Sequence, residues 1–170
     1  MGISIGVAID YLVSGTSPSL GLTLSTMLTA VDSTALLSDN DPSQFSQSMV
    51  FIGRADPSNA EAGSGSRQYI ELGAGRSQED YSIPCYISVT RDGPAQKPAR
   101  DAAIALFDVV AKFVHSDLTL GGVLLQGRSA YISSVTLTQT RDETDTAGGA
   151  LRVAWLMFDI HASNYYNPSI

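Results

Sequence analysis

The sequence lacks the residues on which redox, metal and membrane proteins depend. It has a single cysteine, Cys85, so an internal disulfide framework is excluded. Its two histidines, His115 and His161, are far from each other and from Cys85, which leaves no spacing typical of a zinc site. No run of roughly 18 apolar residues occurs, so we expect no membrane span. The beginning of the chain lacks the basic segment of a secretory signal peptide, which favours synthesis in a cytosol.

Positive charge is scarce as well. Charged residues make up 16% of the chain, the net charge is -7, and no lysine or arginine precedes Arg54. A basic surface for nucleic acid is therefore not expected. The low charged fraction is compatible with extensive contacts between subunits. A length of 170 residues suits one domain, residues 1–170, and the sequence shows neither an internal repeat nor a second domain.

What the chain does have is a continuous unit from Pro98 to Asn164, which opens with an amphipathic helix. Between Pro98 and about His115, apolar residues recur every three or four positions and form one stripe. The stripe consists of Ala103, Leu106, Phe107, Val110, Phe113 and Val114. Asp108 and Lys112 lie on the opposite side, in the order that favours an ion pair along a helix. Gly121-Gly122 then predicts a sharp turn.

A long hairpin follows the helix. Ala130–Thr140 and Leu151–Ile160 are strand-like, with the polar turn Arg141–Gly149 between them. The second run is apolar on both alternations, which is typical of a strand covered on both faces. The helix can cover one face, and the other needs a second layer from this chain or from a neighbouring subunit. This requirement favours an assembly.

The first 45 residues carry mixed signals. Odd-numbered residues from Ile3 to Val13 alternate as in a strand, although a subset of the same segment also fits a helical face. Ser17-Pro18 is typical of an N-cap followed by a first-turn proline, and the apolar residues after it keep helical spacing. We therefore expect residues 1–45 to be mostly helical. Asp39-Asn40-Asp41-Pro42 is expected to be a turn, because the glycine and glutamate of a calcium loop do not follow.

The middle of the chain predicts short strands and one long loop. Met49–Gly53 is a buried strand, Gln68–Leu72 alternates, and Tyr81–Thr90 is the clearest strand of the first half. Pro84 lacks a backbone donor, so we expect the last of these to lie at an edge of the sheet or to enter the sheet late. Asp56–Ser66 is rich in Gly, Ser, Asn and Pro and is expected to be a loop. Residues 163–170 form a tail whose Tyr165 and Tyr166 are expected to dock on another surface.

No pattern points to catalysis, to a cofactor or to a bound metal. Cys85 shares its alternation with apolar residues, so a buried thiol is the simpler interpretation than a nucleophile. His115 suits the last turn of the helix, where a cation complements the helix dipole. His161 is expected to be a polar edge residue near the end of the last strand. Glycine-rich segments such as Gly73-Ala74-Gly75 lack the lysine of a phosphate loop, and the acidic residues Asp142, Glu143 and Asp145 fall in a solvated turn.

The order of these segments resembles the tail-terminator, or tail-completion, proteins of long-tailed phages. The resemblance covers roughly Met49 to Ser163. It rests on Val50-Phe51-Ile52-Gly53, on Ile87-Ser88-Val89, on the alanine-rich helix that closes in Asp117-Leu118-Thr119-Leu120-Gly121-Gly122, and on Ala150-Leu151-Arg152-Val153. The sequence departs from the family in its N-terminal segment without lysine or arginine and in its Tyr165-Tyr166 tail.

The resemblance implies an α+β fold, with a mixed or antiparallel sheet of about four to five strands and helices packed mainly on one face. It also implies a ring, hexameric in this family, that caps the tail tube, stops its polymerisation and gives the head a docking surface. The implied partners are copies of the chain, the tail-tube protein and a head-completion or connector protein. DNA would pass non-specifically through the lumen, at the neck of the virion. No enzymatic activity, cofactor, metal or membrane is implied.

Two groups of residues are candidates for contacts in such a ring. For the subunit interface we predict Asp108, Lys112, Trp155, Met157, Tyr165 and Tyr166. For contacts with the tube or connector, loops are the better candidates, because a rigid sheet can present them to neighbours. These are Asp56, Asn59 and Glu61 in the first loop, and Arg141, Asp142, Glu143 and Asp145 at the hairpin tip. The alternative for either loop is a disordered surface loop without a partner. The alternatives are another neck or tail-tube protein, or a small cytosolic enzyme or ligand-binding domain.

Overall fold

The computed structural model describes residues 5–38, 46–54, 64–69, 77–122, 124, 130–142 and 151–166. In these ranges the order is α1 (Ile5–Ser14), α2 (Leu24–Val31), β1 (Ala35–Ser38), β2 (Ser48–Ile52), β3 (Ser64–Tyr69), β4 (Ser77–Asp92), α3 (Lys97–Ser116), β5 (Ala130–Asp142) and β6 (Leu151–Tyr166). The six strands form one sheet in the order β1-β2-β4-β6-β5, with β3 added beside β4. Only the β1–β2 pair is parallel. The predicted α+β class and mixed sheet are confirmed, with one strand more than expected.

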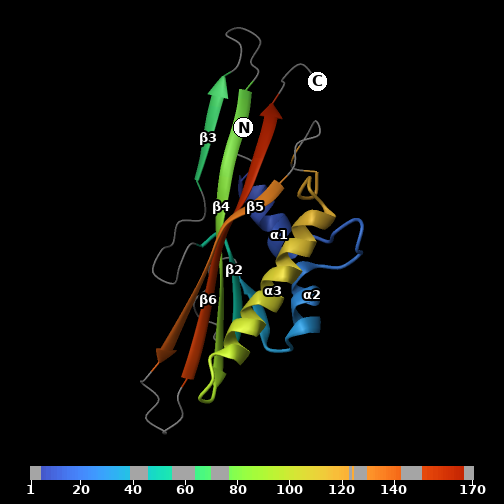
Figure 1. The fold of residues 1–170 in the computed structure, drawn as a ribbon. Helices are drawn as coiled ribbons and strands as arrows, with labels where there is room; N and C mark the ends of the chain where they lie inside the picture. Colours follow the sequence, from blue (N-terminus) through green and yellow to red (C-terminus); the bar gives the residue numbers. More distant parts are fainter. Residues whose placement is uncertain are drawn as a thin grey trace.

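Strands β4 and β6 are the spine of the sheet and run nearly the whole length of the molecule (Figure 1). Each has 16 residues, and they pair from Ser77↔Tyr166 to Asp92↔Leu151. The hairpin predicted at the end of the chain is confirmed as β5–β6. Strand β6 continues to Tyr166, so residues 163–166 belong to the sheet and are not a separate tail.

Pro84 does not mark an edge, because β4 is central. One half of β4 pairs with β2, as far as Cys85↔Ile52, and the other half pairs with β3, starting at Ser82↔Ser64. The Pro84 carbonyl accepts a hydrogen bond from the Arg54 N–H (2.7 Å), so its backbone points to the side of β2 and β3. Pro84, which has no backbone N–H, therefore faces the gap between β2 and β3, where no ladder partner needs that donor. The rule that proline avoids ladder positions holds, although the predicted edge is wrong.

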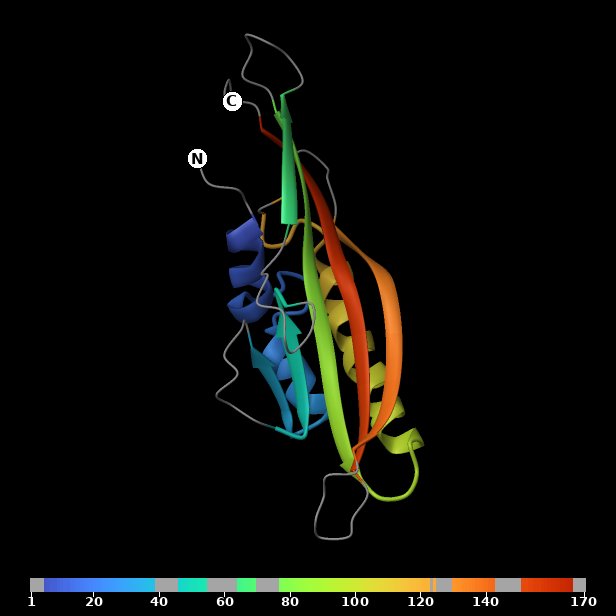
Figure 2. The same ribbon diagram turned by 90° about the vertical axis from the view of Figure 1, so that its left-hand side faces the viewer.

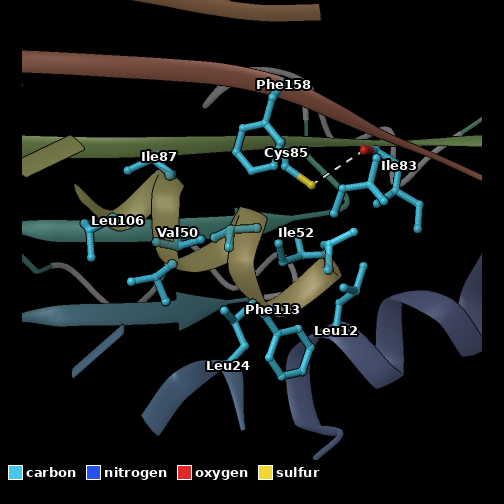
Figure 3. Packing of buried hydrophobic residues seen from close by; sticks show 14 of the residues in the cluster. Leu12, Leu24, Val50, Ile52, Ile83, Cys85, Ile87, Leu106, Phe113 and Phe158 are labelled. Carbon is cyan, nitrogen blue, oxygen red and sulfur yellow. Dashed lines mark hydrogen bonds between the residues drawn. The ribbon is translucent and has the colours of Figure 1, made fainter. Parts of the chain in front are cut away.

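All three helices lie on one face of the sheet, and the hydrophobic core fills the space between them (Figures 1 and 3). Helix α3 covers β4 and β6, and Pro98 lies in its first turn as expected. Five of the six residues of the predicted stripe are buried, and Phe107 is half-buried with its ring edge-on to Phe158 (5.2 Å, 76°). None of the helices among the described residues is long and apolar enough to cross a bilayer.

The N-terminal region is partly as predicted. Helices α1 and α2 confirm its helical character, but α2 begins at Leu24, with Thr23 rather than Ser17 as N-cap. The Ser17 hydroxyl instead receives the Leu20 N–H (3.3 Å) within a turn. Strand β1 was not expected, since its four residues are too few to show a period.

Two further segments differ from expectation. Strand β3 begins at Ser64, so the end of the predicted Asp56–Ser66 loop is strand, and Gln68–Tyr69 is the described part of the strand expected at Gln68–Leu72. The Asp39–Pro42 turn lies outside the described residues. Within α3, no ion pair joins Asp108 to Lys112; the pair with this spacing is Lys97–Asp101 in the first turns.

Candidate functional site

The two faces of β6 differ in cover. Ala154, Leu156, Phe158 and Ile160 point to the helices and are buried. Val153, Trp155 and Met157 point to the opposite face and are only half-buried. Figure 2 views this opposite face, which we call the helix-free face. The sequence predicted that β6 is covered on both faces. Within the described residues, a second layer covers only the face that points to the helices.

The helix-free face carries a second apolar cluster. Met49, Phe51 and Tyr86 are buried there, with Leu36 and Met157 packed against them. The Phe51 and Tyr86 rings are stacked, with centroids 4.5 Å apart and an interplanar angle of 16°. This face is therefore unlike the polar outer face of a strand that alternates apolar and polar residues.

Strand β5 is the long edge of the sheet. It exposes Tyr131 (55%), Val135 (51%) and Leu137 (37%). A β-bulge places Ser134 and Val135 opposite Phe158, and Ser134 has a positive φ of 55°. Apart from the bulge, β5 carries neither a proline nor a lysine, the residues that often block edge-to-edge pairing.

A polar hollow of about 470 Å³ lies where β3, β4, β5 and β6 meet. Its lining includes the side chains of Ser82, Tyr131 and His161, and the Tyr131 and His161 rings are stacked with centroids 5.5 Å apart. At its margin Ser163 donates a hydrogen bond to Asp80. His161 is not an edge residue, because β6 lies between β4 and β5 and continues past it to Tyr166.

The three residues considered for catalysis are not brought together. Cys85 is buried among apolar side chains beside Phe158, and burial raises the pKa of its thiol to about 12 (Figure 3). His115 is exposed in the last turn of α3, and His161 lies in the hollow. The buried interpretation of Cys85 is confirmed. In the described part of the chain, no group of three His, Cys, Asp or Glu residues is placed to hold a metal ion.

The Asp117–Gly122 segment, which carries the most specific part of the resemblance, forms a cap at the end of α3. The Asp117 carboxylate accepts hydrogen bonds from the Tyr11 hydroxyl (2.7 Å), the Thr119 hydroxyl (2.6 Å) and the Gly121 N–H (2.7 Å). Burial opposes ionisation of Asp117, but these donors outweigh it and lower its pKa. Burial and the Asp117 charge raise the pKa of Tyr11. The segment therefore fixes α1 against α3.

A second polar cluster joins the sheet to the other end of the helical layer. Asp32, directly after α2, receives the Arg91 guanidinium (2.5 Å), the Ser48 hydroxyl (2.5 Å) and both the N–H and hydroxyl of Thr34. Burial disfavours the carboxylate, but these hydrogen bonds outweigh it, and the pKa of Asp32 is lowered to about 2. This cluster fixes the positions of α2, β2 and β4. No local pattern in the sequence indicates it, because Ser48 and Arg91 lie 16 and 59 residues from Asp32.

The structure separates the residues predicted for the subunit interface. Asp108 and Lys112 are exposed on α3, whereas Trp155 and Met157 lie on the helix-free face, on the other side of the sheet. Tyr165 and Tyr166 pair through their backbones with Gln78 and Ser77 of β4. Asp108 and Lys112 therefore lie on a different surface of the chain from Trp155 and Met157, and the subunit interface stays a prediction.

The loop residues predicted for contacts with tube or connector are mostly not described. Asp56, Asn59, Glu61, Glu143 and Asp145 lie outside the described residues. Arg141 and Asp142 are the last residues of β5, opposite Arg152 and Leu151. Arg141 and Asp142, the first two residues of the predicted Arg141–Gly149 turn, therefore belong to strand β5.

The exposed edge of β5 was missed as a candidate. Its signal in the sequence is a run of β-branched and aromatic residues free of lysine and proline, but only the strand order shows that it is an edge. No protein-family model and no curated protein matches the sequence.

Proposed function

We propose that this chain is a structural subunit of a ring that caps a phage tail tube, in the manner of the tail-terminator proteins that it resembles. The observation that carries the proposal is the one-sided cover of the sheet. Trp155, Met157 and Val153 stay half-buried opposite the helices, and the long edge strand β5 exposes apolar side chains. Surfaces of this kind are typical of protein–protein contacts.

Closed rings are the usual product of head-to-tail contacts between identical chains. The resemblance supplies the kind of ring, a hexamer at the junction of head and tail. Its neighbours there are the tail-tube protein and a head-completion or connector protein, and it is part of the virion. The separation of Cys85, His115 and His161 favours this structural role over a hydrolytic or redox enzyme.

The charge of the chain suits passage of DNA through the ring. A net charge of -7 repels the DNA backbone, so the polymer slides without being held. Arg54, one of the few arginines of the first half, is buried and does not offer a basic surface. We propose that the lumen is acidic or neutral and that the hairpin tip and the Asp56–Ser66 segment contact the tube or the connector.

Electron microscopy and native mass spectrometry of the purified chain test the proposal. A terminator should form one or two closed rings with a central hole, and added tube protein should end in such a ring. Long tubes of this chain alone would identify it as a tube subunit instead. A monomer that neither self-associates at high concentration nor binds tube ends would contradict the proposal.

A further inference from the structure

The outward side of β5 can be assigned from its hydrogen bonds. Ala130, opposite Ala162, donates its N–H to the Leu118 carbonyl (2.9 Å), so its backbone groups point away from β6. Along an antiparallel strand, the backbone groups of successive residues point alternately towards the partner strand and away from it. Ala162, Leu156 and Ala154 share one alternation of β6, and their partners Ala130, Leu137 and Gln139 therefore point outward alike. Among the residues described, no hydrogen bond reaches the outward groups of Leu137 or Gln139.

Strand β1, at the opposite edge of the sheet, presents a matching group. Ala35 donates its N–H to the Asp32 carbonyl (2.8 Å), so its backbone points away from β2. Leu37, two residues further, points the same way, because backbone direction alternates along a strand. No strand of the described chain pairs with this side of β1. The amide and carbonyl of Leu37 are thus the outward pair of β1.

The register of the sheet places these two edges at the same level. Following the pairs from strand to strand, one row contains Leu37, Val50, Ile87, Leu156 and Leu137. The next row contains Leu36, Met49, Ser88, Trp155 and Thr138. Leu37 and Leu137 therefore end the same row, on the same face of the sheet, and both have outward backbone groups.

The directions of the two edge strands also match. Strand β1 is parallel to β2, and each further step, from β2 to β4, β6 and β5, is antiparallel. Strands β1 and β5 consequently run in opposite directions. Copies related by a rotation axis along the strands keep the same orientation, so β5 of one copy meets β1 of the next in the antiparallel sense.

We propose that β5 of one copy pairs with β1 of a second copy, with Leu137 opposite Leu37 of the neighbour, so that the sheet continues from subunit to subunit. The inference rests on the proposed ring and names the contact that builds it. The occupant is a second copy because level, direction and outward groups all match. Two backbone hydrogen bonds form at the leucine pair, and the exposed Leu137 side chain gains an apolar neighbour.

A cysteine pair tests the register. Thr138 and Leu36 of the neighbour form the adjacent non-hydrogen-bonded pair, with an expected Cα separation of about 4.5 Å, within the range of a disulfide. The double variant Leu36→Cys/Thr138→Cys should give, on mild oxidation, a ladder of covalent multimers on a non-reducing gel. Cys85 needs no substitution, because it is 1% exposed. The single variant Thr138→Cys should give no multimer.

Three outcomes would overturn the inference. A disulfide-linked dimer of Thr138→Cys alone would mean that β5 pairs with β5, and an uncrosslinked double variant would mean that the two edges do not meet. The amides of Leu137 and Gln139 should also exchange slowly with solvent in the assembly and rapidly in the monomer. Fast exchange of these amides in intact rings would contradict the β5–β1 contact but not the proposed ring. A cross-linked open filament would support the β5–β1 contact and contradict the proposed ring.

A charge at the edge tests the same contact by affinity. Leu137→Lys should raise the concentration needed for half-assembly by about tenfold or more, because a lysine at an edge opposes strand addition. The matched control is Ile104→Lys on α3, since Ile104 and Leu137 are similarly exposed, at 39% and 37%. Equal effects of the two substitutions would contradict a specific role for β5. Circular dichroism of both variants establishes that they are folded.

Discussion

At the scale of single residues, Asp32 shows how one carboxylate holds three elements together. Its hydrogen bonds from Arg91, Ser48 and Thr34 stabilise the charged form, and its pKa falls from an ordinary value of 3.8 to about 2. A depressed pKa contributes stability above the pKa of the unfolded state, and this contribution is lost as the pH falls through the folded value. Its effect should therefore fade between about pH 4 and pH 2.

Asp32→Asn is expected to lower the free energy of unfolding by about 1–3 kcal/mol at neutral pH, because Arg91 loses its charged acceptor. Urea unfolding at several pH values measures this. The difference between wild type and variant should be constant above about pH 4 and shrink below it. Asp108→Asn, at an exposed carboxylate of α3, is the control and should have little effect. A constant difference down to pH 2 would contradict the assigned role.

At the scale of elements, the turn after α3 depends on two glycines that look alike in the sequence. Gly121 and Gly122 both have positive φ, 71° and 81°. A Cβ added at Gly121 would lie 2.5 Å from Tyr11 Cδ2, whereas nothing lies within 4 Å of a Cβ at Gly122. Both substitutions strain the backbone, but only the first displaces the tyrosine that donates to Asp117.

Gly121→Ala should therefore destabilise the protein by about 1–3 kcal/mol more than Gly122→Ala, because overpacking adds to the shared backbone strain. Thermal and urea unfolding of the two variants, measured side by side, give the difference directly. Equal losses would mean that Tyr11 moves aside at little cost and that the close approach of the ring to the turn has no energetic role.

The sequence predicted those elements whose signals are local. Helix α3, strand β2 and the β5–β6 hairpin follow from periodicity, and their side-chain patterns agree with the observed burial. The central position of Pro84 does not follow from periodicity. Strand β4 changes its partner from β2 to β3 beside this residue, and that change depends on residues far along the chain. Strand β1 is too short for a period, and Ser17 and Thr23 are equivalent cap signals until tertiary contacts distinguish them.

The candidate surfaces divide in the same way. The apolar character of β6 was visible in the sequence and predicted the need for a second layer. Which of its residues face away from the helices became clear only with the pairing register. The Tyr11–Asp117 bond joins residues 106 positions apart, so no local pattern could have indicated it. That Asp108 and Trp155 lie on opposite sides of the sheet could not be predicted for the same reason, and their part in a subunit interface stays a prediction.

At the scale of the whole molecule, edge pairing through β5 and β1 extends the sheet but does not by itself cover the helix-free face. The half-buried Trp155 lies on that face, in the row that ends at Thr138 and Leu36. In the proposed ring, with its axis along the strands, the helix-free face would turn either to the lumen or to the outside. A segment of the tube or connector protein that reaches over this face can then supply the missing layer.

Trp155 is the only tryptophan of the chain, so its fluorescence reports on this face alone. If edge pairing accounts for the whole ring contact, quenching of Trp155 by acrylamide should stay nearly unchanged as the assembly forms from monomer. Quenching should then fall when tube protein is added. If quenching instead falls in step with the rise in mass as the ring forms, neighbouring subunits cover the helix-free face, and β5 is not the main contact. Leu137→Lys, measured below the concentration at which it assembles, supplies the reference value for the monomer.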